Sequence, residues 1–243
     1  MLSYFPDLEY MVIGGWCPVL RNKSEVTHPG TLDVDILFKE SYQSGSLKSV
    51  IESFIESGFM PSAKHPFQLL KSQEINGKHF VYNIDLLHPN MANNSDQIGM
   101  FVDHLELDVP INNSEEKLKK MMSIVLPNSE ILFRENLFDE FKESGETFKL
   151  VTFDGMFITK MDSCQKQKRE RDSFDIYLAF VNKGIDVGKI NNLAESDSRI
   201  KESLAGFSRY LKEESGAFNQ NVQHFCKSIT GSPAKYILGE LNA

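Results

Sequence analysis

Hydrophobic and polar positions follow two different periods along this chain. Apolar residues form short strand-like runs at residues 10–13 and 32–38, which predicts two β-strands. Between them, the double glycine Gly14-Gly15 precedes a segment that we expect to begin a helix near Gly15. Residues 46–59 place apolar side chains at helical spacing and end near a glycine, so they predict a helix. A short helical start is expected before the first strand.

The next part of the chain has the signals of a β-hairpin. Residues 66–89 contain two strand-like runs joined at Asn76-Gly77, the residue pair most typical of a tight hairpin turn. A further pair of strands is expected on either side of Asn128. The first part of the chain is therefore predicted to be a mixed sheet with helices.

The pattern changes to helical periodicity in the second part of the chain. Asp154 is the expected N-cap of the first helix there, and apolar positions at helical spacing continue to the C-terminus. We therefore predict an α+β protein, with a mixed-sheet domain at residues 1–150 and a helical C-terminal domain at residues 151–243.

Composition and charge narrow the class of protein. The chain has 243 residues, of which 41% are hydrophobic and 25% are charged, as is ordinary for a globular protein. It contains no apolar run near the length that spans a bilayer and no signal-peptide pattern, so we expect a cytoplasmic protein without a membrane segment. The net charge of -8 disfavours a large electrostatic surface for nucleic acid. Its three cysteines lack metal or disulfide spacing, and we expect buried thiols.

Two aspartates lie on one side of the second predicted strand. In "TLDVDILF" the period of two places Asp33 and Asp35 on one face, with α-carbons about 7 Å apart. Such carboxylates suit Mg²⁺, which takes one or two of them together with phosphate oxygens. Two Mg²⁺ ions about 4 Å apart are a common arrangement for phosphoryl-type transfer. The alternative is the solvent face of an amphipathic sheet.

A third acid and the double glycine complete this candidate site. Asp85 lies near the end of the apolar run "VYNIDLLHP" and is the best third metal ligand. Gly14 and Gly15 join a strand to a helix start, where backbone N–H groups can approach a phosphate. Taken alone, a double glycine indicates only a tight turn.

This order of elements resembles the nucleotidyltransferase superfamily with the DNA polymerase β-like palm. The resemblance covers residues 8–90 as the catalytic palm of a nucleotidyltransferase domain at residues 1–150. It implies that Gly14 and Gly15 hold nucleotide phosphates and that Asp33 and Asp35 bind Mg²⁺, with two ions expected. It also implies that Asp85, the third acid, binds metal or activates the acceptor hydroxyl. The sequence departs from the family after the glycines, where Trp16 replaces the usual residues and is interpreted as a core anchor of the helix.

A long polar stretch marks the second half. Residues 162–173 contain Cys164 as their only apolar residue, and a helix polar on all sides faces solvent or lines a wet cleft. On a continuous helix Lys160, Gln167 and Arg171 share a face, where the lysine and the arginine would neutralise triphosphate charge. The alternative for the basic run is a solvated face.

The same stretch resembles the second signature of the AbiEii/AbiGii abortive-infection toxin family. The matching positions are Lys160, then Lys168 or Arg169, and then Asp172 and Asp175 in a "D-x-x-D" pattern. The resemblance implies that Lys160 and Arg169 contact the nucleotide and that Asp172 lies near the catalytic centre. The alternative for the two acids is a helix cap and first turn.

The two resemblances together predict a Mg²⁺-dependent nucleotidyltransferase. We expect transfer of a nucleoside monophosphate from a nucleoside triphosphate (NTP) to an acceptor hydroxyl, with RNA such as tRNA as the acceptor implied by the toxin family. That family also implies a toxin–antitoxin system and a protein antitoxin as partner. Two alternatives stay open: a small-molecule enzyme similar to aminoglycoside and lincosamide nucleotidyltransferases, and a catalytically silent nucleotide-binding module.

Overall fold

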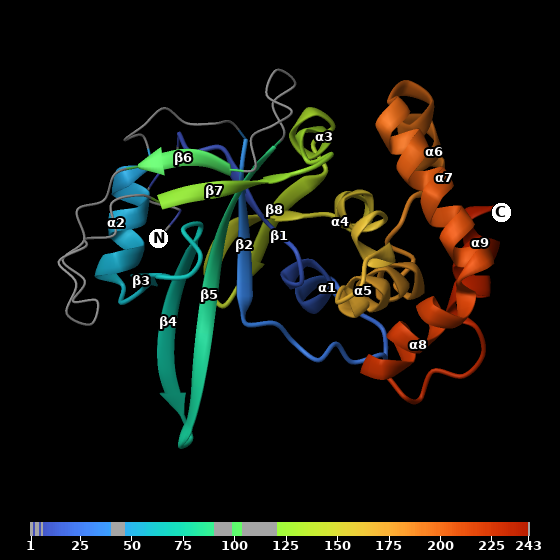
Figure 1. Cartoon of the computed structure of the whole chain (residues 1–243), viewed down its shortest axis with the longest axis horizontal. Coiled ribbons are helices and arrows are strands. Elements are labelled where there is room, and N and C mark those ends of the chain that lie inside the picture. The colour runs from blue at the N-terminus through green and yellow to red at the C-terminus, as the bar shows by residue number, and fades with distance from the viewer. Residues whose placement is uncertain are drawn as a thin grey trace. The chain divides into compact units, whose positions relative to one another are not determined.

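The computed structural model describes residues 2, 5, 7–39, 47–89, 99–103 and 121–242. Its strands are β1 (Tyr10–Ile13), β2 (Asp33–Phe38), β3 (Met60–Pro61), β4 (Gln68–Ile75), β5 (Lys78–Pro89), β6 (Gly99–Asp103), β7 (Met121–Leu126), β8 (Phe138–Glu143) and β9 (Glu146–Val151). Its helices are α1 (Trp16–Arg21), α2 (Lys48–Glu56), α3 (Glu130–Arg134), α4 (Phe153–Lys160), α5 (Glu170–Val181), α6 (Val187–Ser196), α7 (Ser198–Glu213), α8 (Ser215–Phe225) and α9 (Pro233–Leu241). The predicted fold class, a mixed sheet followed by a helical C-terminal part, is confirmed (Figure 1).

The chain packs as two compact units. Unit 1 consists of Met1–Ile13, Leu32–Phe133 and Glu140–Leu150. Unit 2 consists of Gly14–Thr31, Arg134–Asp139 and Val151–Ala243. These units describe packing, and the predicted division into domains at residue 150 stays a prediction.

Unit 1 is built on a mixed sheet. In the described residues nine strands join in one sheet, and seven of them follow the order β3-β4-β5-β2-β1-β9-β8, while β7 pairs with β5 and β6. At its centre β2 pairs parallel with β5 and antiparallel with β1. The predicted strands at residues 10–13 and 32–38 are confirmed, and β2 is thereby held between two neighbours.

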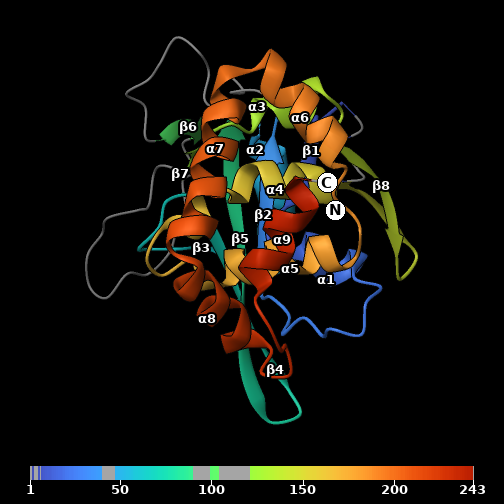
Figure 2. The ribbon, with the colours of Figure 1, turned by 90° about the vertical axis from the view of Figure 1, so that its right-hand side faces the viewer.

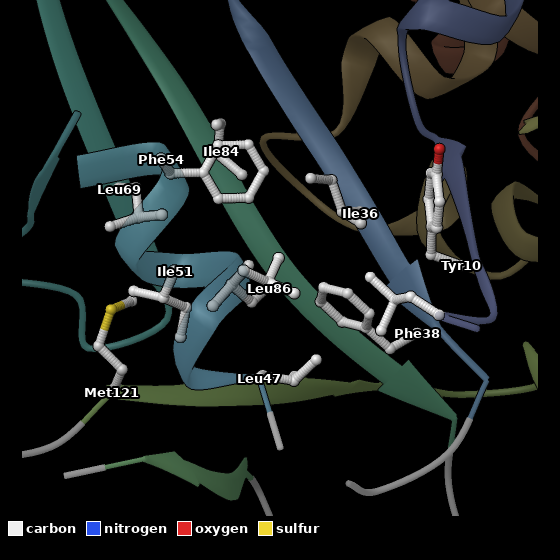
Figure 3. Close-up of a cluster of buried hydrophobic side chains, with 12 residues drawn as sticks. Tyr10, Ile36, Phe38, Leu47, Ile51, Phe54, Leu69, Ile84, Leu86 and Met121 are labelled. Atoms are coloured by element: carbon white, nitrogen blue, oxygen red, sulfur yellow. The ribbon is translucent and has the colours of Figure 1, made fainter. Parts of the chain in front are cut away.

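Helix α2 covers one face of this sheet. Its residues Ile51 and Phe54, together with Leu47 at its N-cap, pack against strand side chains that include Ile36 and Ile84 (Figure 3). All five side chains are almost fully buried. Because strand side chains alternate between faces, Asp33 and Asp35 lie on the face of β2 opposite to α2.

The predicted hairpin at Asn76-Gly77 is confirmed. Strands β4 and β5 pair antiparallel up to Ile75 and Lys78, and the hairpin extends well past its neighbours in both views (Figures 1 and 2). Asn76 has φ 52° and Gly77 has φ 73°, the left-handed pair that a tight hairpin turn requires. Register along β5 therefore follows from the turn.

Two predictions about elements are wrong, and part of a third lies outside the described residues. The strand predicted after Asn128 is helix α3, which Glu130 in its first turn favours through the helix dipole. Asp154 does not cap α4, because the Thr152 side chain accepts the bond from the Gly155 N–H. Most of the predicted helical start before β1 lies outside the described residues, as does Ser46.

Unit 2 contains the helical part of the chain. Helix α5 contacts α4, α8 and α9, and α1 contacts both α4 and α5. Phe157 lies at the centre of an aromatic core, with ring centroids 5.5 Å from Phe180 and 5.4 Å from Phe207. Two of the three cysteines, Cys17 and Cys164, are buried, and Cys226 is half-buried, all as free thiols. In the described part of the chain no helix is long and apolar enough to span a membrane.

Candidate active site

Three acids lie on the same face of two neighbouring strands in unit 1. The parallel register of β2 and β5 pairs Asp33 with Asn83 and Asp35 with Asp85. Val34 and Ile84, between them in the register, are also paired and point to the face that α2 covers. The acids predicted as metal ligands are therefore neighbours through backbone pairing alone, although paired residues of β2 and β5 are fifty positions apart in the sequence.

Side-chain amides hold two of these carboxylates. The Asn83 Nδ2 donates to Asp33 Oδ1 at 2.9 Å, and the Gln68 Nε2 donates to Asp85 Oδ1 at 2.7 Å. Gln68 is the antiparallel partner of Asp85 on β4, so it lies on the same face. Neither amide was identified as a site residue from the sequence. Their positions beside the acids follow from which strands pair and in which register, and no sequence motif shows this.

The environment of Asp85 favours its protonated form. Burial is the main cause that raises the pKa of this carboxyl, and the negative charge of Asp33 adds to the rise. The hydrogen bond from Gln68 opposes it and lowers the pKa. A carboxylate with a raised pKa is a stronger base than an ordinary aspartate, which suits a group that accepts a proton.

The acids on this strand face are the residues predicted to hold Mg²⁺. Among the described residues, no group of three or more His, Cys, Asp or Glu side chains is arranged to hold a metal ion. Mg²⁺ in phosphate sites takes only one or two carboxylates and completes its shell with water and substrate oxygens. Asp33 and Asp35, two residues apart on one strand face with Asp85 opposite Asp35, supply this oxygen chemistry.

The double glycine joins the end of β1 to the start of α1. Ile13, the residue before Gly14, is the register partner of Asp35. Gly14 has φ 72°, which a residue with a β-carbon rarely adopts, and Gly15 is the N-cap of α1. A β-carbon on Gly15 would lie 3.3 Å from the Thr31 β-carbon, so this position is tight as well.

Trp16 follows the glycines in the first turn of α1. The residue is half-buried, and its indole Nε1 is a buried donor without a hydrogen-bond partner among the described residues. Trp16 was predicted to anchor α1 in the core. The structure agrees in part, because Trp16 is only half-buried whereas its neighbour Cys17 is fully buried.

The second signature forms a buried cluster in unit 2. Lys160 Nζ donates to Asp172 Oδ1 at 2.7 Å and to Asp175 Oδ2 at 2.5 Å. Ser163 Oγ donates to the other oxygen of Asp172 at 2.7 Å. The side chains of Lys160 and Asp172 are about one-tenth exposed, and that of Asp175 is fully buried. Two of the predicted residues, Lys160 and Asp172, are therefore in direct contact.

A histidine that was not identified from the sequence completes this cluster. His28 Nε2 lies 2.9 Å from Asp175 Oδ1, across 147 positions of the chain. Its side chain is only 3% exposed. A single histidine in a loop carries no periodic signal, and only the folded chain shows its partner.

The cluster holds its charges through mutual contact. Burial alone would lower the pKa of Lys160, but the negative charges of Asp175 and Asp172 outweigh burial and raise it. Burial would likewise raise the pKa of Asp175, but the charge of Lys160 and the bond from His28 keep it below its ordinary value. Lys160 and Asp175 are therefore an ion pair, and the ammonium has one N–H left for a further acceptor.

The predicted helical face of Lys160, Gln167 and Arg171 does not exist. Helix α4 ends at Lys160, a short 3-10 turn follows at Ser163–Gln165, and α5 begins only at Glu170. The polar stretch has no apolar side to bury, so packing cannot stabilise a helix there. The break allows Asp172 to reach back to Lys160. Arg169 and Lys168 are exposed, and the nucleotide contact expected of Arg169 stays a prediction.

Comparisons with known proteins found similarity to this chain among solved structures. No family model matches the sequence, and no curated protein matches it. Among solved structures, an antigenic nucleotidyltransferase-like protein from Paracoccidioides brasiliensis is similar at a TM-score of 0.41 and 12% identity, over 93% of this chain and 92% of that chain. The lincomycin-bound lincosamide antibiotic adenylyltransferase LnuA is similar at a TM-score of 0.37 and 17% identity, over 76% and 91%. Likeness at these scores assigns neither family nor activity.

Proposed function

We propose that this protein is a Mg²⁺-dependent nucleotidyltransferase. The observation that supports the proposal most is the register of β2 and β5, which places Asp33, Asp35 and Asp85 on one strand face. Gly14 directly follows the register partner of Asp35 and has a conformation that favours glycine. A merely solvated strand face needs neither feature.

The proposed reaction transfers a nucleoside monophosphate. The oxygen of an acceptor hydroxyl forms a bond to the α-phosphorus of an NTP, the bond from this phosphorus to the bridging oxygen of the β-phosphate breaks, and pyrophosphate leaves. Asp85 accepts the hydroxyl proton, which its raised pKa favours. Gly14 and Gly15 hold phosphate through backbone N–H groups.

Two further groups of residues would stabilise negative charge on the substrate and on the leaving pyrophosphate. Asp33 and Asp35, with Asp85, would hold Mg²⁺, which when bound neutralises phosphate charge and lowers the barrier to displacement. Lys160 would stabilise the charge that develops on the leaving pyrophosphate through its remaining N–H. Asp172 and Asp175 orient the ammonium for that contact.

For the acceptor we propose RNA, with tRNA ends as the first candidates, and a toxin role restrained by an antitoxin. The contact of Lys160 with Asp172 and Asp175 supports this choice, because these are the residues that resemble the toxin-family signature. A small-molecule acceptor is the second candidate. The net charge of -8 favours it, because an acidic protein attracts a cationic aminoglycoside more readily than a polyanion.

A substitution of Asp35 tests the proposed site. We expect Asp35→Asn to lower nucleotide transfer about 100-fold or more while the fold is retained, because a neutral amide is a far weaker Mg²⁺ ligand. The assay offers Mg²⁺ and each labelled NTP with total RNA, protein and an aminoglycoside as parallel acceptors. Asp7→Asn, at an exposed position of the same unit, is the matched control.

The results separate the candidates. Equal transfer by the wild type and Asp35→Asn would show that chemistry does not depend on this site. Labelled RNA supports the toxin proposal, particularly if induced expression slows growth and Asp35→Asn relieves the effect. Labelled aminoglycoside with unaltered growth supports the small-molecule enzyme instead.

A further inference from the structure

His28 is a buried side chain that the proposed reaction does not use directly. It lies in the segment between α1 and β2, five residues before Asp33. Two hydrogen bonds hold it, one to Asp175 Oδ1 and one from the backbone N–H of Gly30 to its Nδ1, both at 2.9 Å. Its ring also lies 5.7 Å from the ring of Phe174 on α5.

These two bonds select one tautomer of the imidazole. Nδ1 accepts from the Gly30 N–H, so it carries no proton of its own. The ring proton is therefore on Nε2, which donates it to Asp175. His28 is a neutral donor whose orientation is set by its own loop.

Asp175 is thereby held from two sides by different parts of unit 2. Its Oδ2 accepts from Lys160 at the end of α4, and its Oδ1 accepts from His28. The carboxylate is fully buried, so loss of either donor leaves an acceptor that water does not replace. Without His28, Asp175 loses the donor on its Oδ1 side, so one of the two acids that position the Lys160 ammonium is less firmly held.

We propose that His28 is a positioning residue for nucleotide transfer, which rests on the function proposed above. The Nε2–H of His28 orients Asp175, and Asp175 orients Lys160. Through Nδ1 the same ring accepts the hydrogen bond from the Gly30 N–H, which orients the ring within its own loop. A packing role alone would need neither of the two nitrogens.

Two substitutions of His28 separate a positioning role from a packing role, because each replaces the hydrogen-bonding group of one ring nitrogen and removes the other. Gln at position 28 keeps a donor near the position of Nε2 and loses the acceptor at Nδ1. Asn keeps an acceptor near Nδ1 and does not reach Asp175. We expect His28→Asn to lower kcat about tenfold with little change in KM for the NTP, since the effect is on charge that develops during transfer. We expect His28→Gln to retain most of the activity.

Three further measurements test whether His28 affects kcat through its hydrogen bond to Asp175. A double-mutant cycle with Asp175→Asn is expected to show that the loss from His28→Asn nearly vanishes once Asp175 is altered. Denaturant unfolding of each variant reports whether it folds. Nitrogen NMR of the histidine rings in the wild type is expected to show a neutral Nε2–H tautomer whose signal is absent in His28→Gln.

The outcomes are distinguishable from those that test the proposed function. If Asp35→Asn abolishes transfer but folded His28→Asn and His28→Gln have equal activities, the proposal for His28 is wrong and the proposed function stands. Additive losses in the cycle, or a ring protonated on Nδ1, would also overturn it. If the wild type transfers no nucleotide to any acceptor, both proposals are wrong.

Discussion

At the scale of single residues, the charge of a buried side chain in this protein depends on its nearest polar neighbour. Lys160 stays charged because two carboxylates contact it. His88 in unit 1 is as deeply buried, but its partner is the neutral Ser123, whose Oγ lies 2.9 Å from Nδ1. Burial without an opposite charge lowers the pKa of His88 to about 4.

This low pKa predicts that acid destabilises the fold through His88. In the unfolded chain the histidine has a pKa of about 6.5, so between about pH 6.5 and 4 the unfolded state binds a proton that the folded state does not. The contribution of His88 is therefore complete above this range and is lost as the pH falls, by up to about 1.4 kcal/mol per pH unit. Urea unfolding across the range measures it.

His88→Asn should reduce this dependence. The amide keeps a polar partner for Ser123 and does not titrate, so the free energy of unfolding should fall less steeply with acid than in the wild type. His79→Asn is the control, because it makes the same substitution at a side chain that is three-quarters exposed. Identical slopes for the wild type and His88→Asn would show that another group carries the acid sensitivity.

At the scale of elements, the hairpin of β4 and β5 sets the register that brings Gln68 opposite Asp85. The register depends on the turn, where Asn76 and Gly77 both have positive φ. A one-residue slip would turn the site side chains to the other face of the sheet. The turn is thus a structural requirement of the candidate site, although it is far from it along the strands.

We expect Gly77→Ala to destabilise the protein by about 1 kcal/mol, the cost of a β-carbon in the left-handed conformation. Among the described residues no atom outside the turn lies within 4 Å of the added β-carbon, so the cost is conformational and not steric. Gly216→Ala in α8 is the matched control, because that position is equally open and lacks a positive φ. Helix propensity predicts a small gain there. Equal changes in denaturant midpoint would contradict the argument.

The elements that the sequence predicted correctly are those whose signals are local. Strands β1 and β2, helix α2 and the hairpin each have a period or a turn within one segment. Helix α3 was predicted as a strand because "SEILF" is too short for its period to decide. The break between α4 and α5 was missed because a polar run gives no packing signal.

The residues of the candidate site divide in the same way, into those that a local signal predicted and those that were missed. The strand period placed Asp33 and Asp35 on one face, and a single acid near a strand end identified Asp85 as a candidate. Gln68, Asn83 and His28 were missed, since their partners are determined by register or by contacts between distant segments. Such pairings follow from the folded backbone and have no counterpart in spacing along the chain.

At the scale of the whole molecule, negative charge is in excess and part of it is concentrated at the acids of unit 1. The chain has 34 acidic and 26 basic residues. The charge of Asp33 already raises the pKa of Asp85, which means that the two carboxylates repel each other in the folded state. A cation that binds these acids should therefore stabilise the fold as well as support chemistry.

We expect Mg²⁺ to raise the melting temperature of the wild type, because a ligand that binds only the folded state adds about 2.7 kcal/mol at a concentration of 100 times its Kd. Mg²⁺ should stabilise Asp35→Asn far less, because a neutral amide is a weaker Mg²⁺ ligand than a carboxylate. Potassium chloride at matched ionic strength controls for screening of the overall charge. Asp7→Asn removes the same charge from an exposed position and should respond to Mg²⁺ as the wild type does. Equal stabilisation of the wild type and Asp35→Asn by Mg²⁺ would place the cation elsewhere on the protein, and the assignment of these acids as its ligands would be wrong.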